Sequence, residues 1–194
     1  MGRISLLCWA VMAHDDRMNV VTDSEQDGRL IATKLVGVLD MKGEDEEDTR
    51  FLREMAENAT RYISSFSWCE SILDSYFGGG VGGIFVIFLF HIHSGRPDVD
   101  PWIWIMTGDI PSAYLPVSDC TSPEEAFETY ILGMKRWVEF ARGNTDGIDE
   151  EDIPPVNVPA TPEWAEKLDK RLGTLETTIR PFFQDDEAGS DEAP

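Results

Sequence analysis

Two histidines separated by a single residue, His91 and His93, are the side chains of this sequence best suited to chemistry. Alternate residues of a β-strand project to one face, so two imidazoles at this spacing could hold the same metal ion. Asp98 and Asp100 follow closely and could add a carboxylate ligand. The remaining histidine, His14, is distant in the chain, and the glutamate that follows a cupin-type His-x-His motif is missing. The favoured interpretation is therefore two strand-end histidines beside a polar loop, with a metal site as the alternative.

Three aspartates, Asp98, Asp100 and Asp109, could provide a carboxylate pair for acid–base catalysis. Each of them stands next to a proline or a glycine, where an aspartate commonly organises a turn by accepting hydrogen bonds from nearby backbone amides. The turn interpretation is favoured, so the sequence predicts no catalytic residue. These aspartates and the two histidines are its candidate functional residues.

Two tryptophans, Trp102 and Trp104, are the candidates for contact with a partner. Their alternation places both on one face of the same predicted strand. We expect them to pack in the core, as large aromatic side chains usually do. An aromatic patch that binds another protein is the alternative interpretation.

The glycines Gly78, Gly80 and Gly83 have the spacing of a dinucleotide-binding motif. That motif needs a strand before the glycines and a helix after them, because the amides of the helix N-terminus contact the pyrophosphate. Here the predicted order is helix, glycines, strand, so a turn is the better interpretation. The sequence contains no Walker motif and neither of the GxSxG and HExxH motifs, and no cofactor is expected.

Acidic residues dominate the composition: 37 of the 194 residues are Asp or Glu and 16 are Lys or Arg, which gives a net charge of −21. Such a surface repels nucleic acid and anionic membranes, because phosphate binding needs basic side chains. It suits a basic protein partner or multivalent cations, or it serves solubility alone. The three cysteines are far apart and form no Cys-x-x-Cys pair, which favours a reducing cytoplasm. The longest apolar run, residues 84–90, is too short for a membrane helix.

The elements that position these residues are predicted to form one α+β domain with a small antiparallel sheet at residues 82–117. Its first strand covers residues 81–93, where residues 84–90 are apolar at both alternating sets of positions. This pattern is typical of a central strand that is covered on both faces. A polar turn with glycine and proline follows, and residues 101–107 form the antiparallel neighbour. Residues 113–117 form a short third strand.

About four helices are expected to cover the sheet. Apolar side chains recur in them at intervals of three and four residues, and capping residues mark their starts. One start is Ser67, with Glu70 three residues later. Another is Ser122, with Pro123 directly after it. The predicted helices span residues 47–66, 68–77, 122–142 and 161–181.

Composition divides the chain into three parts. Residues 1–43 are interpreted as an N-terminal extension, in which the β-branched segment 29–39 supplies one extra strand. Residues 44–183 form the globular domain. Residues 184–194 are acidic and lack bulky side chains, so they are expected to be a disordered tail.

Three segments carry a resemblance to a known group: WIWIMTGDIPSAYL, SPEEAFETYILGMKRWVE and TPEWAEKLDKRL. They resemble small uncharacterised bacterial proteins that have a domain of unknown function. The resemblance covers residues 51–183 and implies a bacterial, cytoplasmic, single-domain protein. It implies no activity, so no functional residue is transferred from it.

The function that these observations favour is non-enzymatic: an acidic interaction protein that binds a basic protein partner, as an immunity or regulatory factor does. Small acidic α+β domains are common among toxin-immunity proteins, which is an analogy of size, charge and fold class. The alternative is a small metal-dependent enzyme or metal-binding protein that uses His91, His93 and the nearby aspartates. Nothing in the sequence indicates an oligomeric state.

Overall fold

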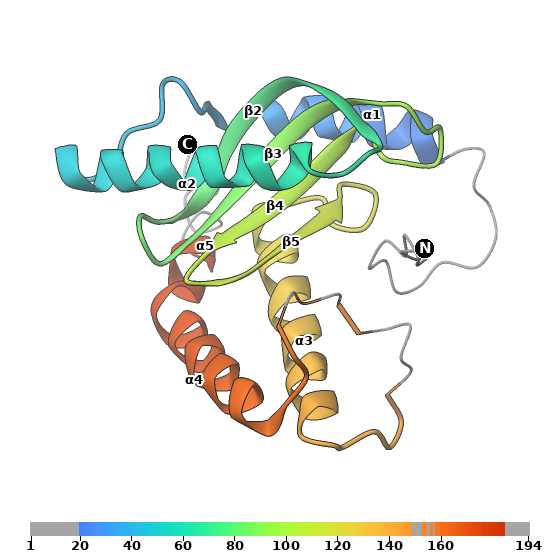
Figure 1. Ribbon diagram of the computed structural model, residues 1–194. Coiled ribbons are helices and arrows are strands. Elements are labelled where there is room, and N and C mark those ends of the chain that lie inside the picture. Colours follow the sequence, from blue (N-terminus) through green and yellow to red (C-terminus); the bar gives the residue numbers. More distant parts are fainter. Residues whose placement is uncertain (1–19, 149–152, 155, 157, 185–194) are drawn as a thin grey trace, which may run out of the picture.

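Five antiparallel strands form one sheet, and helices cover both of its faces (Figure 1). The computed structural model describes residues 20–148, 153, 154, 156 and 158–184. The strands follow one another across the sheet in chain order, and all neighbours are antiparallel. The predicted α+β fold class is therefore confirmed. The strands are β1 (Val36–Gly37), β2 (Cys69–Val81), β3 (Phe85–Ser94), β4 (Trp102–Gly108) and β5 (Ile110–Pro116).

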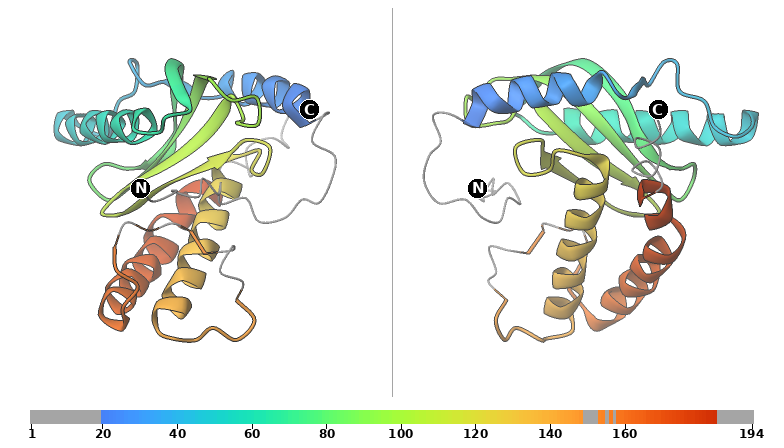
Figure 2. Two further views of the ribbon diagram at one scale, coloured as in Figure 1. Left: turned by 45° about the vertical axis from the view of Figure 1, so that its right-hand side comes forward. Right: turned by 180° about the vertical axis from the view of Figure 1, so that it is seen from behind.

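Two hydrophobic clusters pack against the sheet, one on each face. The helix α2 (Glu46–Ser64) covers one face, and the other carries α1 (Val20–Ala32) and α3 (Pro123–Ala141) (Figure 2). Two further helices, α4 (Pro162–Thr178) and α5 (Arg180–Gln184), pack with α3.

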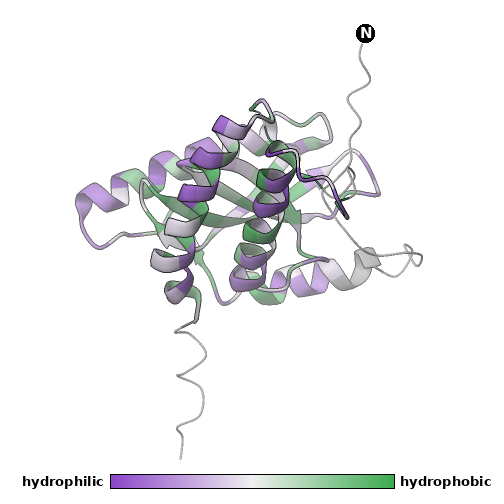
Figure 3. Cartoon of the chain, turned by 90° about the horizontal axis from the view of Figure 1, so that it is seen from below, coloured by the Kyte–Doolittle hydropathy of each residue, from purple (hydrophilic) through white to green (hydrophobic). Residues whose placement is uncertain are grey.

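The central strand β3 contributes side chains to both clusters. Phe85, Ile87 and Leu89 belong to the cluster with α3, and Val86 and Phe88 belong to the cluster with α2. The predicted central strand with two covered faces is thus confirmed. Figure 3 shows hydrophobic strands in the sheet and helices that alternate between hydrophobic and hydrophilic residues. Among the described residues, no helix combines the length and the apolar character that crossing a membrane requires.

Three helices form close to their predicted positions, because local start signals agree with the apolar face behind them. The Ser122 hydroxyl accepts a hydrogen bond from the Glu125 amide at 3.1 Å, and Thr161 caps α4 in the same way. The helix α2 begins after Asp45, whose carboxylate accepts from the Asp48 amide at 2.8 Å. The N-cap serine and the following proline predicted for α3 are confirmed.

The helix predicted for residues 68–77 is wrong, because this segment belongs to β2. The strand pairs with β3 along its length, and the ladder satisfies backbone groups of β3 that would otherwise lack partners. Gly80 permits a close approach of the two strands, since a Cβ there would lie 2.2 Å from the Phe85 carbonyl oxygen. The pairing that an apolar central strand requires therefore overrides a local capping signal.

The strand predicted for residues 29–39 is wrong for most of that segment. Its first residues belong to the helix α1, and β1 is confined to two residues. Ala32 is buried in the cluster on one face of the sheet, and Met41 is buried in the cluster on the other. The described part of the predicted extension therefore packs on the core. Residues 1–19 of that extension and residues 185–194 of the predicted tail lie outside the described residues.

Candidate functional site

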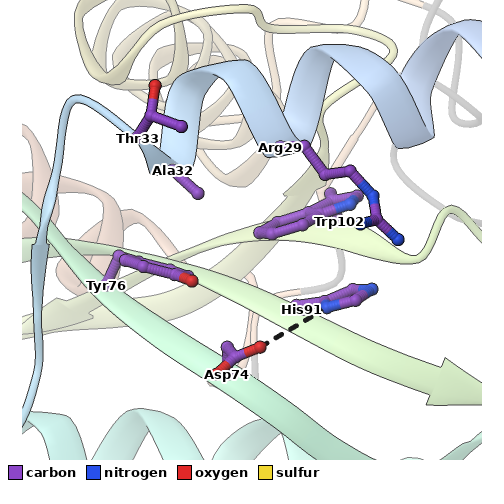
Figure 4. A pocket seen from close by; sticks show the side chains of 7 residues that line it. All are labelled: Arg29, Ala32, Thr33, Asp74, Tyr76, His91 and Trp102. Carbon is purple, nitrogen blue, oxygen red and sulfur yellow. Dashed lines mark ion pairs between the residues drawn. The ribbon is translucent and has the colours of Figure 1, made fainter.

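A hollow of about 250 Å³ lies between α1 and the strands β2, β3 and β4 (Figure 4). It gathers side chains of different chemistry: a guanidinium, a carboxylate, a phenol, an imidazole and an indole. In Figure 4 the helix α1 runs above the indole, and the imidazole lies below it. The side chains that line the hollow are Arg29, Ala32, Thr33, Asp74, Tyr76, His91 and Trp102.

The rings of His91 and Trp102 form the centre of the site. The two residues are opposite each other in the β3–β4 ladder, and their rings stack with centroids 4.2 Å apart and 3° between the planes. On the side of the indole that meets α1, a Cβ at Gly28 would lie only 2.1 Å from Trp102 Cγ. Only glycine lets the helix approach this closely, so α1 and the imidazole together fix the indole between them.

Two carboxylates flank the His91 imidazole. Asp74 Oδ2 lies 3.8 Å from Nδ1, and Glu25 Oε1 lies 3.8 Å from Nε2. Both distances exceed a hydrogen bond. Glu25 also accepts a hydrogen bond from Arg29 Nε at 2.9 Å. Arg29 is therefore compensated by Glu25, whereas within the described residues Asp74 has no cationic nitrogen at hydrogen-bond distance.

The indole N–H of Trp102 is buried and has no hydrogen-bond partner among the residues that the structure describes. Figure 4 places this nitrogen at the end of the hollow where the Arg29 guanidinium lies. A buried donor without a partner costs about 1–3 kcal/mol. The packing of α1 and the imidazole on the indole therefore leaves this polar group uncompensated within the described residues.

Of the predicted site residues that lie outside the hollow, three have an oppositely charged partner of their own. His93 Nδ1 lies 3.1 Å from Glu70, Asp98 accepts a hydrogen bond from Arg96 at 2.9 Å, and Asp109 lies 3.1 Å from Arg171. In the described part of the chain, no three His, Cys, Asp or Glu side chains are grouped closely enough to hold a metal ion. The alternative hypothesis of a metal site at the two histidines thus lacks a third ligand there.

The two tryptophans contribute to the core. Trp104 is fully buried, and its indole N–H donates to the Cys120 carbonyl oxygen at 2.8 Å. Trp102 is only 3% exposed, and it borders the hollow. Neither side chain forms an exposed aromatic patch.

Comparison with known proteins adds no family to this description. No protein-family model matches the chain, and no curated protein and no solved structure matches it either. The resemblance to small bacterial proteins therefore stays a prediction. The site has to be interpreted from its own geometry.

Sequence reasoning misses three of the residues that give the hollow its character: Arg29, Asp74 and Tyr76. They come from α1 and β2, the two elements whose secondary structure is predicted wrongly. One signal is present in the sequence, since Asp74 and Tyr76 alternate as residues on one face of a strand do. The position of Arg29 in the hollow depends on the packing of α1 against the sheet, and no local sequence pattern predicts that packing.

Asp100 holds the start of β4 to the turn that follows β5. Its carboxylate oxygens accept hydrogen bonds from the Trp102 amide at 2.9 Å and the Ser118 amide at 3.0 Å. This is the backbone-organising role that we predict for an aspartate beside a proline. Burial raises the pKa of the carboxyl group above its ordinary value of 3.8, although these hydrogen bonds oppose the shift.

Replacing Asp100 with asparagine is expected to destabilise the fold by about 1–2 kcal/mol at neutral pH, because the amide nitrogen cannot replace one of the two acceptors. The pKa of Asp100 is higher in the folded than in the unfolded protein, so its ionisation opposes folding at neutral pH. That cost disappears as the pH falls through the raised pKa toward 3.8. Urea unfolding should therefore show the advantage of the wild type over Asp100→Asn growing with acidification. An advantage that does not change with pH would contradict the shift.

Proposed function

We propose that the protein is a non-enzymatic interaction protein that binds a basic protein partner, as an immunity or regulatory factor does. The observation that carries the proposal is the net charge of −21 in 194 residues. A surface of this sign attracts basic proteins over a distance, accelerates their association and disfavours acidic partners.

The distribution of charge on the fold supports this proposal. Many basic side chains are already engaged by neighbouring carboxylates, among them Arg29, Arg142 and Arg180. Residues 44–46 are acidic and exposed at the start of α2, where the positive end of the helix dipole favours them. An approaching basic protein therefore meets excess negative charge.

The described residues offer little that favours catalysis. Burial raises the pKa of the Cys120 thiol to about 11, and it also raises the pKa of Cys69, so both thiols stay protonated at neutral pH. The histidines stand with separate carboxylates, and the predicted aspartates take part in turns or ion pairs. A binding role is therefore the better interpretation.

The proposal predicts salt-sensitive binding to a basic protein. A partner is first captured with the immobilised protein at low salt, then purified and titrated. Raising the salt from about 10 mM to 100 mM shortens the Debye length from about 30 to 10 Å. We expect the affinity to fall at least about tenfold over this range, mainly through slower association. Acidic proteins of similar size serve as the control. The proposal would be overturned if the captured proteins were not basic, or if the affinity did not change with the salt concentration.

A further inference from the structure

We propose that the hollow at His91 and Trp102 receives an arginine side chain of the basic partner, with Asp74 as the carboxylate that binds its guanidinium. The inference rests on the proposed function, and it names the place where the partner is anchored. Protein interfaces concentrate much of their binding energy in a few anchoring side chains, and arginine is enriched among them.

The charge of Asp74 is the first reason. Its side chain is 59% exposed, and its basic neighbour, His91 Nδ1, lies 3.8 Å away. Arg29, the cation that also lines the hollow, is bound by Glu25 at 2.8 Å. Asp74 is therefore available to a cation from outside, and a guanidinium can place two parallel N–H groups on one carboxylate.

The aromatic walls favour arginine over lysine. Tyr76 extends its hydroxyl toward the rings of His91 and Trp102 in Figure 4, and the Tyr76 and Trp102 centroids are 6.2 Å apart. Both faces of the indole are covered by α1 and the His91 imidazole, so the ring that a guanidinium can stack on is that of Tyr76. A guanidinium is planar and weakly hydrated, so it stacks on an aromatic ring while it hydrogen-bonds at its edge. A lysine ammonium is a compact and strongly hydrated charge that makes no such stack.

The size of the hollow fits one side chain. Its volume of about 250 Å³ is below the roughly 300–1,000 Å³ that small-molecule pockets usually have.

The sheet leaves access to Asp74. The short strand β1 pairs only with Tyr76 and Phe77, and Val38 donates one more hydrogen bond, to the Ser75 carbonyl. Asp74 lies just past these contacts, so no described strand pairs with β2 on its outer side there. A segment of the partner can therefore bring its arginine to the carboxylate from this edge.

The test uses the full chain and a short blocked peptide with one arginine between glycines. A matched peptide carries citrulline, which has nearly the same shape without the charge. Both are titrated while the Trp102 indole N–H is followed by NMR, with Trp102→Phe to assign that signal. We expect the arginine peptide to shift the signal and to bind at least about tenfold more tightly than the citrulline peptide.

Two variants locate the binding group. Asp74→Asn removes the proposed carboxylate at an exposed position. We expect it to lower the affinity for the arginine peptide about tenfold, a modest effect because solvent screens the ion pair. Glu57→Gln removes an equal charge from the exposed face of α2, across the sheet, and should leave the affinity unchanged. The NMR spectra of both variants show directly whether the fold is retained.

Equal affinities for the two peptides, or an unchanged affinity in Asp74→Asn, would overturn the assignment of the hollow. The same variants are titrated with the basic partner protein, which separates the two proposals. Salt-sensitive binding that is equal in the wild type and Asp74→Asn refutes only the arginine site. The absence of any basic partner refutes the proposed function itself.

Discussion

Replacing Trp104 with alanine is expected to lower the free energy of unfolding by about 3–5 kcal/mol. The indole is fully buried in the cluster that joins the sheet to α3. Truncation leaves a cavity, and it also removes the hydrogen bond that the Cys120 carbonyl accepts from the indole N–H at 2.8 Å. Urea unfolding followed by circular dichroism measures the loss as a lower midpoint.

Trp164 provides the matched control for this substitution. It lies on α4 and is 38% exposed, with the Lys167 ammonium 4.6 Å from the centre of its ring. Its replacement by alanine removes that contact and part of its packing, and we expect a cost of about 1 kcal/mol. Similar losses in the two variants would contradict the placement of Trp104 at the centre of the core.

Gly28→Ala is expected to destabilise the protein by about 2–3 kcal/mol, since extra volume in a packed contact forces side chains or backbone to move. The new Cβ would stand 2.1 Å from Trp102 Cγ, so either α1 moves away from the sheet or the indole leaves its stack on His91. Both movements distort the hollow. The arginine peptide should therefore bind this variant more weakly, even under conditions in which it is fully folded.

Gly173→Ala is the control for Gly28→Ala, because the expected change in stability has the opposite sign. At Gly173, in the helix α4, no atom of the described residues beyond the adjacent residues and the helix's own backbone lies within 4 Å of an added Cβ. Alanine is favoured over glycine inside a helix, so this variant should gain about 1 kcal/mol. The same chemical change thus stabilises one helix and destabilises the other, as thermal or urea unfolding can measure. A gain in both variants would show that α1 does not pack tightly on Trp102.

Local signals were sufficient for the parts of the fold in which sequence neighbours decide the structure. The caps at Ser122 and Thr161 lie at the starts of amphipathic segments, and both helices form there. The apolar run in β3 indicates a strand covered on both faces, and the structure has one. The capping pattern at Ser67 and Glu70 predicts a helix that does not form, because residues 69–81 pair with β3 as a strand instead.

The candidate site could be predicted only in part. His91 is recognisable because its spacing from His93 suggests a shared metal ion. Trp102 is recognisable because its alternation with Trp104 suggests contact with a partner. Their stacking follows from the register of β3 against β4, which the sequence does not specify. Asp74 and Arg29 reach the same hollow through β2 and α1, and these contacts depend on tertiary packing. The site is thus a product of four elements, of which two were predicted correctly.

The order of the strands also affects how the chain can fold. Every strand pairs with the one that precedes or follows it in the sequence. The loops that join β2, β3, β4 and β5 are short, whereas α2 lies between β1 and β2. The local contacts among the last four strands favour rapid folding. The hollow needs three of these strands together with α1, which precedes all of them in the chain. It is complete only when that helix has docked on the finished sheet. A guanidinium that binds there would select the native state over a sheet without its helix, and by mass action it would favour completion of folding.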